Sequence, residues 1–385
     1  MGKKSALIIT MHKVYNYGSA LQAWALQETI RKIGFDCTLI DYLYPNQYYF
    51  SHASKVVISQ IPFYKRLRIS KLVNYVKRRY LYRHEEQKLL FQTFWNKHFL
   101  LTEEYKAPEE LLNNPPKADC YITGSDQVWN PNTMYGDPSF FLNFGNTNVS
   151  RIAYAASFGT NEIPSEYQYR YREFLLKYNH IGVREKSGQS LVFALSDKES
   201  SLVCDPTLLL TQEDYEALAK ESTIKIDKPY LLAYILDYAY NPRPAIDSII
   251  QQVAKKLGLH VVYLLCGNQN GFKWGTTTVS AAGPNEFVSL FRNASFVVTS
   301  SFHGTVFSLL HEKSFYAVLP AENKDSRISS LLTDLGLSER GIRANQSFSL
   351  SKESNLAVDY QVVNSRISRL RNRSLEFLFE SMKGC

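Results

Sequence analysis

The stretch TSSFHGTVFSLL, residues 299–310, combines the end of a buried strand, a tight turn and the start of a helix. The residues before it, NASFVV at 293–298, are short, apolar and β-branched, which is typical of a core strand in a parallel sheet. Gly304 permits a tight turn, and apolar side chains then recur at helical spacing. The stretch therefore predicts a strand–turn–helix unit of an α/β fold.

The start of that helix is a candidate anion site. The first N–H groups of a helix have no partner inside it, and together with the helix dipole they attract anions. A histidine at this position, His303, can hold a phosphate and move a proton. The alternative is structural: Ser300 and Ser301 only cap the helix, and His303 is a turn residue with satisfied hydrogen bonds.

The composition is that of a large globular protein. The 385 residues are 45% hydrophobic, which is enough for two or three domains. No run of about 18 apolar residues is present, so a membrane-spanning helix is not expected. The five cysteines are scattered and form no metal-binding or CxxC pattern. These features predict a protein of the reducing cytoplasm without a metal site.

Strand-like and helix-like segments alternate through two halves of the chain. We expect an N-terminal Rossmann-like domain over residues 1–210, a C-terminal one over 225–345, and a helix at 350–385 that packs back. The fold class is therefore α/β, with two doubly wound sheets facing a cleft. The expected strands are 6–11, 37–42, 119–123, 151–157, 180–184 and 201–204, then 230–236, 260–265, 296–299 and 315–319.

Polar residues follow most of these strands. Ligands of such sheets bind outside the carboxyl ends of the strands, whereas each of these loops alone is ordinary turn chemistry. Their number predicts one shared site. The polar loops are 16–19, 124–127, 157–159, 184–186, 205–206 and 300–303.

Arg184 stands out among these residues because it directly follows an apolar strand. A guanidinium at that place can bind a phosphate or a carboxylate through two parallel hydrogen bonds. The alternative is an ion pair with Glu185 or another neighbour.

A basic segment interrupts the first half, in an insert at about residues 52–100. Nine Lys or Arg and no acidic residue lie between Lys55 and Arg83. The segment can form an amphipathic helix. It is either a solvated helix packed on the first domain, or it docks on an anionic membrane or on the diphosphate of a lipid-linked acceptor. Residues 55–83 would then place the protein at the inner face of the membrane. A nucleic-acid partner is not expected, because the charge is confined to one insert.

Six stretches of the chain form a characteristic series. They are NYGSALQAWALQ (16–27), YITGSDQVWNP (121–131), IAYAASFG (152–159), GVREKSG (182–188), CDPTLLL (204–210) and SSFHGTVFSLL (300–310). Together they resemble the polysaccharide pyruvyl transferase family. The resemblance implies a fold like the GT-B glycosyltransferases and transfer of the enolpyruvyl group of phosphoenolpyruvate to two hydroxyls of a sugar. The products would be a pyruvate ketal and phosphate, without a further cofactor. The acceptor would be a galactose-type residue of a surface polysaccharide or its lipid-diphosphate-linked precursor.

The resemblance also assigns residues. His303 aligns with the family histidine at the donor, but Ser301 stands where several members have arginine. Arg184 matches the arginine of the N-terminal domain. The donor set is therefore Arg184, Ser300, Ser301 and Gly304, with Lys324 and Arg327 as candidates to replace the lost charge. The cleft residues are Asn16, Tyr17, Gly18, Ser125 and Gln127.

Two residues would perform the chemistry. Protonating the methylene carbon of phosphoenolpyruvate needs a general acid with a pKa near neutrality, which suits a histidine such as His303. Asp126 is the best-placed carboxylate to accept the proton of the sugar hydroxyl, although an Asp in this loop can equally form an Asx turn.

A GT-B glycosyltransferase that uses a nucleotide-sugar is the alternative enzyme. It would need a carboxylate in the C-terminal domain to hold the ribose. The loop CGNQNGFKWG, residues 266–275, contains no acidic residue, which argues against this alternative.

Overall fold

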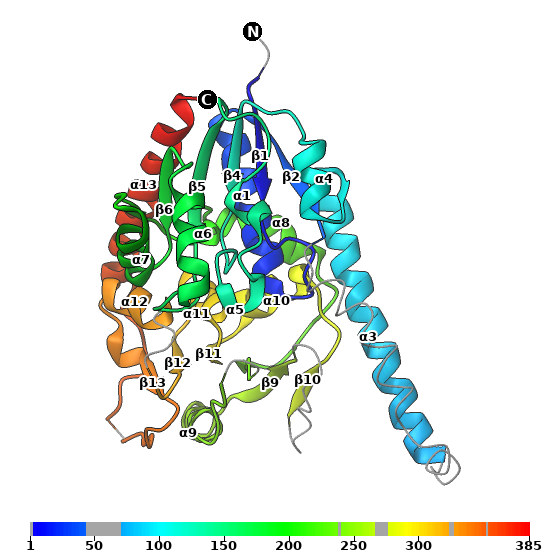
Figure 1. Ribbon diagram of the computed structural model, residues 1–385. Coiled ribbons are helices and arrows are strands. Elements are labelled where there is room, and N and C mark those ends of the chain that lie inside the picture. Colours follow the sequence, from blue (N-terminus) through cyan, green and yellow to red (C-terminus); the bar gives the residue numbers. More distant parts are fainter. Residues whose placement is uncertain (1–2, 44–70, 238–239, 266–275, 323–326, 352) are drawn as a thin grey trace.

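Two parallel β-sheets, one above the other in Figure 1, form the body of the protein. The computed structural model describes residues 3–43, 71–237, 240–265, 276–322, 327–351 and 353–385, without the side chains of 71–84. The expected loop at 266–275 and Lys324 lie outside the described residues.

The N-terminal sheet has seven parallel strands in the order β3-β2-β1-β4-β5-β6-β7. Its strands are β1 (Ser5–Ile9), β2 (Asp36–Tyr42), β3 (Leu101–Tyr105), β4 (Cys120–Thr123), β5 (Ser150–Ala156), β6 (His180–Val183) and β7 (Ser201–Leu202). The α-helices of this half are α1 (Tyr17–Ile33), α3 (Lys71–His98), α4 (Pro108–Asn113), α5 (Pro131–Met134), α6 (Ser165–Leu175), α7 (Lys186–Ser196) and α8 (Gln212–Glu221). Two 3₁₀-helices, η2 (Pro138–Phe141) and η3 (Pro206–Leu208), complete it.

The C-terminal sheet has six parallel strands in the order β10-β9-β8-β11-β12-β13. Its strands are β8 (Tyr230–Tyr234), β9 (His260–Leu264), β10 (Thr277–Val279), β11 (Phe296–Thr299), β12 (Phe315–Leu319) and β13 (Gly341–Arg343). Its helices are α9 (Ala245–Leu257), α10 (Pro284–Asn293), α11 (Phe302–Leu310), α12 (Arg327–Asp334), the 3₁₀-helix η4 (Ser338–Arg340) and α13 (Tyr360–Lys383).

Both sheets are doubly wound, which confirms the predicted fold class. In each, the first strand is central, the chain moves outward to one edge and then returns past the first strand. The strand order reverses between β1 and β4 in one sheet and between β8 and β11 in the other. Ligands of open α/β sheets bind at such switch points, so the loops after these strands are the first place to look for a site.

Three edge strands were absent from the sequence prediction: β3, β10 and β13. They lie at the sheet edges, and β10 and β13 have only three residues each. β3 reads LTEEY and keeps two exposed glutamates. Strands at an edge are buried less than central strands and lack the continuous apolar run that identified the central ones.

The two sheets share a hydrophobic core. One cluster of buried side chains includes Leu26 and Ile122 from the first half as well as Leu232 and Phe307 from the second. Helix α1 packs against α10 between the sheets. The carboxyl ends of the strands in both sheets therefore meet at one boundary.

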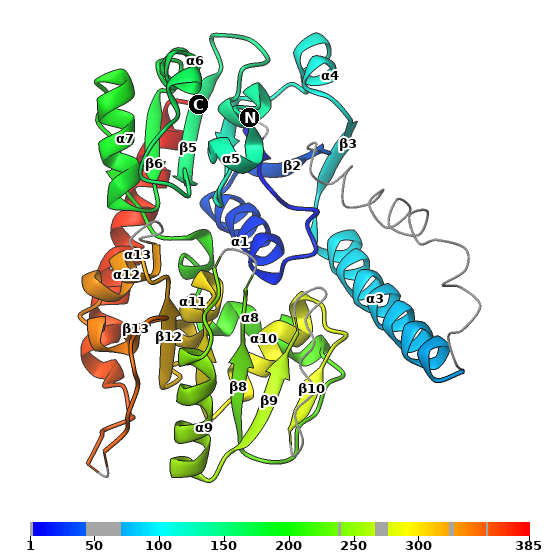
Figure 2. The ribbon, with the colours of Figure 1, turned by 60° about the horizontal axis from the view of Figure 1, so that its bottom comes forward.

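Helix α13 returns from the C-terminal half to the N-terminal half, as expected for the last helix (Figure 2). At its start, the Tyr360 hydroxyl donates to the carbonyl oxygens of Ser308 and Lys313. Just past its middle, the Ser374 hydroxyl accepts a hydrogen bond from the Cys204 N–H at 2.9 Å. The helix therefore joins both halves through backbone groups.

Helix α3 contains the end of the basic insert and projects from the body in both views (Figures 1 and 2). The last turns of α3 are packed and not solvated, because Phe91, Phe94 and Trp95 are buried in the core that both halves share. The rest of the basic segment, residues 55–70, lies outside the described residues. Among the helices of the described chain, none combines the length and the apolar character needed to cross a bilayer.

A buried histidine at the end of α11 makes stability depend on pH. His311 is 3% exposed, and neither ring nitrogen has a hydrogen-bond partner in the described part of the chain. Burial, helped by the charges of Lys313 and Arg292, lowers the pKa of His311 to about 3. An unfolded chain binds this proton near the ordinary value of about 6.5, so the folded state loses stability as the pH falls below that value.

We therefore expect His311→Leu to remove part of the acid sensitivity. The lowered pKa costs the wild type about 2 kcal/mol of unfolding free energy between pH 7 and pH 5, and the variant should not lose this amount. Urea denaturation at both pH values measures the difference. His180→Gln, at an exposed histidine, is the control. Equal losses in the wild type and His311→Leu would contradict the assignment.

Candidate active site

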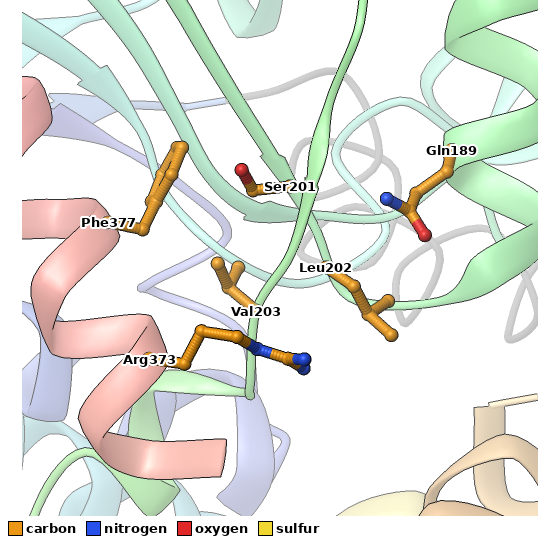
Figure 3. Close-up of a pocket in the computed structure, with 6 residues that line it drawn as sticks. All are labelled: Gln189, Ser201, Leu202, Val203, Arg373 and Phe377. Carbon is orange, nitrogen blue, oxygen red and sulfur yellow. The ribbon is translucent and has the colours of Figure 1, made fainter. Parts of the chain in front are cut away.

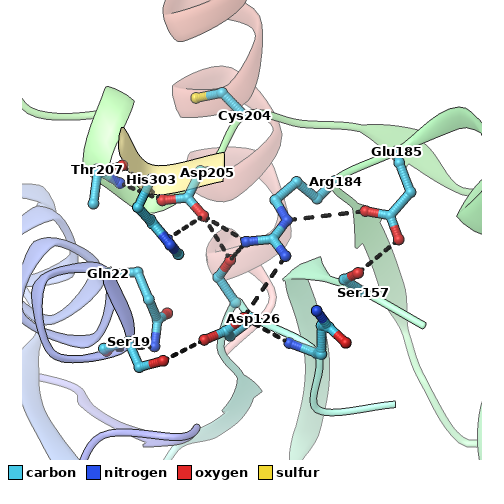
Figure 4. A network of polar contacts seen from close by, with 12 residues as sticks. Ser19, Gln22, Asp126, Ser157, Arg184, Glu185, Cys204, Asp205, Thr207 and His303 are labelled. Atoms are coloured by element: carbon cyan, nitrogen blue, oxygen red, sulfur yellow. Dashed lines mark hydrogen bonds and ion pairs between the residues drawn. The ribbon is translucent and has the colours of Figure 1, made fainter. Parts of the chain in front are cut away.

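Four ionisable side chains from the ends of strands meet where the two sheets face each other (Figure 4). Asp126 follows β4, Arg184 follows β6, and Asp205 follows β7 by two residues. His303 comes from the other sheet, in the first turn of α11 after β11. All four residues are buried. The sequence prediction grouped the loops correctly but named only three of these residues as site residues.

Arg184 is the central cation of this cluster. Its Nη1 donates to Oδ2 of Asp205 at 2.8 Å, and its guanidinium carbon lies 4.6 Å from the centre of the Phe302 ring. Its Nη2 is 3.8 Å from Asp126 and its Nε is 3.9 Å from Glu185, and neither nitrogen has a hydrogen-bond partner in the described part of the chain. A buried guanidinium edge with unused N–H groups is suited to bind two oxygens of an anion.

Asp205 is the site residue that the sequence prediction missed. Its Oδ1 accepts hydrogen bonds from the N–H and the hydroxyl of Thr207, so the residue caps the short helix η3. Its Oδ2 accepts from Arg184 and from the Ser125 hydroxyl at 3.2 Å. Its position after a predicted strand indicated a possible site residue, but Asp followed by Pro is also typical of an ordinary turn.

His303 is held between the two halves of the chain. Its Nε2 is 3.4 Å from Oδ2 of Asp205, which is an ion-pair distance but long for a hydrogen bond. The other side of the ring touches the start of α1, where a Cβ added to Gly18 would lie 2.0 Å from Nδ1. Gly18, predicted as a cleft residue, therefore allows the histidine ring to approach α1, and any side chain at position 18 would displace it.

Asp126 has an unusual backbone conformation, with φ of 78°. Asp is one of the residues that tolerate positive φ best, and the Ser157 N–H holds the Asp126 carbonyl at 3.0 Å. Its carboxylate accepts hydrogen bonds from the Ser19 hydroxyl at 2.6 Å and from the Gln127 N–H at 3.0 Å. The residue thus belongs to the cluster, and its one local side-chain bond is to the N–H of the next residue and not to the residue two positions on, as an Asx turn would have it.

The environment keeps the Asp126 carboxylate ionised. Burial raises its pKa, but the charges of Arg184 and His303 and the hydrogen bond from Ser19 outweigh burial, and the net pKa is lowered. A carboxylate with a lowered pKa is a weak base at neutral pH. It is better suited to orient a hydroxyl group by accepting a hydrogen bond than to act as the general base that removes the hydroxyl proton.

Three residues of the stretch 299–310 have structural roles: two form hydrogen bonds to backbone groups, and one allows close packing. The Ser300 hydroxyl donates to the carbonyl of Leu236 and accepts from its N–H, both at 2.8 Å. The Ser301 hydroxyl caps α11 by accepting from the Gly304 N–H at 3.3 Å. A Cβ at Gly304 would strike Thr299, so glycine permits close packing of helix on strand. Ser301 thus takes the capping role that was its alternative, whereas Ser300 does not cap α11 and instead fixes the backbone after β8.

Arg327 reaches the cluster from the first residue of α12. Its guanidinium carbon is 5.9 Å from the centre of the Phe302 ring, on which Arg184 also lies. With the Gln127 amide oxygen turned toward it, both terminal nitrogens of Arg327 bind that oxygen, at 2.8 and 2.9 Å. Arg327 therefore brings a second cation to the predicted donor site, in contact with the predicted cleft residue Gln127.

The remaining cleft residues lie at the start of α1. The Asn16 side chain caps that helix by accepting from the Ser19 N–H. Tyr17 is fully buried, and its hydroxyl donates to the Leu265 carbonyl and accepts from the Gln87 amide. Its ring stacks on Phe287 from the other half. Tyr17 is therefore part of the core between the halves, and its side chain does not face an open cleft.

A cavity of about 320 Å³ lies beside the edge strand β7, between α7 and α13 (Figure 3). It contains none of the predicted site residues. Its lining residues are Gln189, Ser201, Leu202, Val203, Arg373 and Phe377. Since the ionisable cluster lies outside this cavity, we locate the candidate active site by chemistry and not by cavity size. In the described part of the chain, no group of three or more His, Cys, Asp or Glu side chains could hold a metal ion.

The geometry supports binding of a small anion next to a proton donor. Arg184 and Arg327 supply positive charge, and the N–H groups that begin α11 supply aligned dipoles. His303 lies in the same turn of that helix. Arg184 and His303 contact the same oxygen of Asp205. A cation that can hold an anion and a group that can donate a proton therefore lie side by side, which suits general acid catalysis on a phosphorylated or carboxylated substrate.

Several solved structures match most of the chain at low sequence identity. The UDP-GlcNAc 2-epimerase of Methanocaldococcus jannaschii matches with a TM-score of 0.47 and 9% identity, over 96% of this chain and 93% of that one. UDP-N-acetylglucosamine 2-epimerase from Rickettsia bellii matches at 0.42 and 11%, over 98% of both chains. Arabidopsis thaliana UGT89C1 matches at 0.44 and 11%, over 99% and 94%.

Comparison with curated protein sequences gives no significant match. The model of one protein family, described as polysaccharide pyruvyl transferase, matches residues 16–321. This range contains all the predicted site residues with the exception of Lys324 and Arg327. It also contains Asp205. On this match, the chain belongs to the polysaccharide pyruvyl transferase family.

Proposed function

We propose that the protein transfers the enolpyruvyl group of phosphoenolpyruvate to two hydroxyls of a galactose-type sugar and forms a pyruvate ketal. The observation that supports this proposal most strongly is the buried Arg184, whose Nε and Nη2 have no hydrogen-bond partner in the described part of the chain. Phosphoenolpyruvate carries a phosphate and a carboxylate, each of which fits such a guanidinium edge. Membership of the family supports transfer to a polysaccharide.

The reaction needs one proton at carbon and two attacks by oxygen. His303 protonates the methylene carbon, and the cationic centre that results is attacked by the first hydroxyl. Phosphate then leaves, and the second hydroxyl attacks the same carbon. Of the two hydroxyl protons, one replaces the proton that became part of the methyl group and the other leaves with the phosphate. The bonds formed and broken therefore balance without any redox partner.

Each residue of the cluster has a part in this scheme. Arg184 and Arg327 bind the donor and stabilise the departing phosphate. Asp126 accepts a hydrogen bond from an acceptor hydroxyl and orients it. Gly18 leaves the space that His303 occupies. No cofactor is required beyond phosphoenolpyruvate as co-substrate.

The first test is acceptor-dependent release of phosphate. The wild type should release phosphate from phosphoenolpyruvate only with an acceptor such as methyl β-galactoside, and the ketal methyl group should be visible by proton NMR. Loss of general acid catalysis in His303→Gln should lower this rate by roughly 100-fold or more. His180→Gln is the control. Wild-type turnover by a folded His303→Gln would remove the histidine from the mechanism.

The second test concerns the shape of the cation at position 184. Arg184→Lys keeps the charge but cannot form two parallel hydrogen bonds. Losing a charge-assisted contact typically costs about 1.5 to 3 kcal/mol, so donor affinity should fall by roughly 10- to 150-fold. Calorimetry with phosphoenolpyruvate measures this. Arg172→Lys, at a half-exposed arginine, should bind as the wild type does, and the assignment fails if Arg184→Lys does so as well.

We also propose that the acceptor is lipid-linked and that the basic segment 55–83 docks on the anionic surface that carries it. The nine cationic residues without an acidic neighbour support this proposal. Each Lys or Arg near such a surface contributes on the order of 1 kcal/mol. Exposed charges are screened over about 10 Å at 0.1 M salt, so docking should weaken as salt rises.

Neutralising Lys71, Arg78 and Arg79 together to Gln should reduce co-sedimentation with phosphatidylserine vesicles. It should also slow turnover of a lipid-linked acceptor and leave a soluble galactoside unaffected. The matched control neutralises three exposed cations elsewhere, Lys220, Lys255 and Arg369. The docking proposal is wrong if the wild type does not sediment with the vesicles even at low salt.

A further inference from the structure

The chain uses the same local motif twice, and only one copy touches the candidate site. Asp137-Pro138-Ser139 and Asp205-Pro206-Thr207 each begin a 3₁₀-helix with a capping aspartate. In both, Oδ1 accepts the N–H of the residue two positions on, at 2.8 and 3.0 Å. Both aspartates are buried. The Asp137 copy lies outside the candidate site, so its contacts show which interactions an Asp-Pro cap needs for a purely structural role.

The second carboxylate oxygen has different partners in the two copies. Oδ2 of Asp137 accepts from the neutral Tyr42 hydroxyl at 2.6 Å. Oδ2 of Asp205 instead lies 2.8 Å from Arg184 and 3.4 Å from His303. A neutral partner is thus sufficient for a buried cap. An arginine and a histidine on the second oxygen of Asp205 are not explained by capping.

The electrostatic consequence is opposite in the two copies. Burial raises the pKa of Asp137 above its usual range, although the hydrogen bonds from Tyr42 and Ser139 oppose it. Burial acts in the same direction on Asp205, but the charges of His303 and Arg184 overcome it and hold its pKa far below the usual range. Asp205 therefore carries a full negative charge beside the imidazole.

We propose that Asp205 is a positioning residue that orients the His303 imidazole for proton transfer to the bound donor. The inference rests on the proposed function, in which His303 is the general acid. Asp205 belongs to the N-terminal half and His303 to the C-terminal half, so the acid is completed only when the two halves meet. On the opposite side of the ring, a Cβ at position 18 would lie 2.0 Å from Nδ1, so only glycine leaves room for the imidazole there.

The test is Asp205→Asn, which retains a capping oxygen and removes the charge. We expect kcat to fall by roughly 100-fold or more, as for loss of a general acid. The dissociation constant for phosphoenolpyruvate should stay equal or decrease, because a negative charge next to an anionic donor has been removed. A merely structural defect would weaken donor binding as well. The pattern is also opposite to that of Arg184→Lys.

Asp137→Asn is the matched control. It makes the same change in the same motif and should keep kcat and donor affinity within about twofold. Asp205→Glu restores the charge on a longer side chain and should recover part of the lost kcat. An unchanged kcat in Asp205→Asn, or weaker donor binding together with lower kcat, would overturn the assignment.

Removing the charge at position 205 can also prevent folding, because it leaves Arg184 without its closest partner. Thr207→Val then serves as the second variant: it keeps the carboxylate and removes the hydroxyl that fixes Oδ1. A fall in kcat by roughly three- to tenfold at unchanged donor affinity is expected, and an unchanged kcat refutes the inference. A wild type that neither binds nor turns over phosphoenolpyruvate would refute the proposed function instead, so the two failures are distinguishable.

Discussion

The candidate site depends on the burial of one guanidinium, that of Arg184. Its side chain is 2% exposed, and a buried charge is tolerated only when it is paired. Asp205 supplies the short contact, and the Phe302 ring covers one face. Removing one partner of a buried ion pair typically costs about 3 to 5 kcal/mol. The loops after β6, β7 and β11 are therefore coupled through a single cation, which keeps a polar site rigid inside an apolar core.

The topology places these loops together before any side chain is considered. Two doubly wound sheets present their switch points to each other, so each half contributes part of the site and neither half contains all of it. The N-terminal half supplies the carboxylates and Arg184, and the C-terminal half supplies the histidine, the helix start and Arg327. The Tyr17 ring, stacked on Phe287, keeps the halves in contact away from the charges.

The sequence predicts most of this arrangement, and the omissions have physical causes. Central strands such as β11 are continuous apolar runs and were recognised, whereas β3, with its exposed glutamates, was not. Arg184 and His303 were identified because a charged residue after a buried strand needs an explanation. Asp205 was missed because Asp-Pro is common in turns, and only the three-dimensional contacts separate it from the equivalent Asp137. Tyr17 belongs to one of the predicted polar loops, residues 16–19, but its side chain points into the hydrophobic core.

Ser301 stands where several family members have an arginine, and the structure shows how the candidate site can form without a positive charge at that position. A serine caps a helix by accepting an N–H, which typically contributes about 1 kcal/mol, and an arginine cannot do so because it has no acceptor. Ser301 thus fixes the start of α11, and with it the position of His303. In the proposed function, Arg327 supplies the positive charge instead; it shares the Phe302 ring with Arg184 and contacts Gln127 of the other half. Because Arg327 begins α12, this charge comes from an element outside the stretch 299–310, and the two halves gain another contact across their boundary.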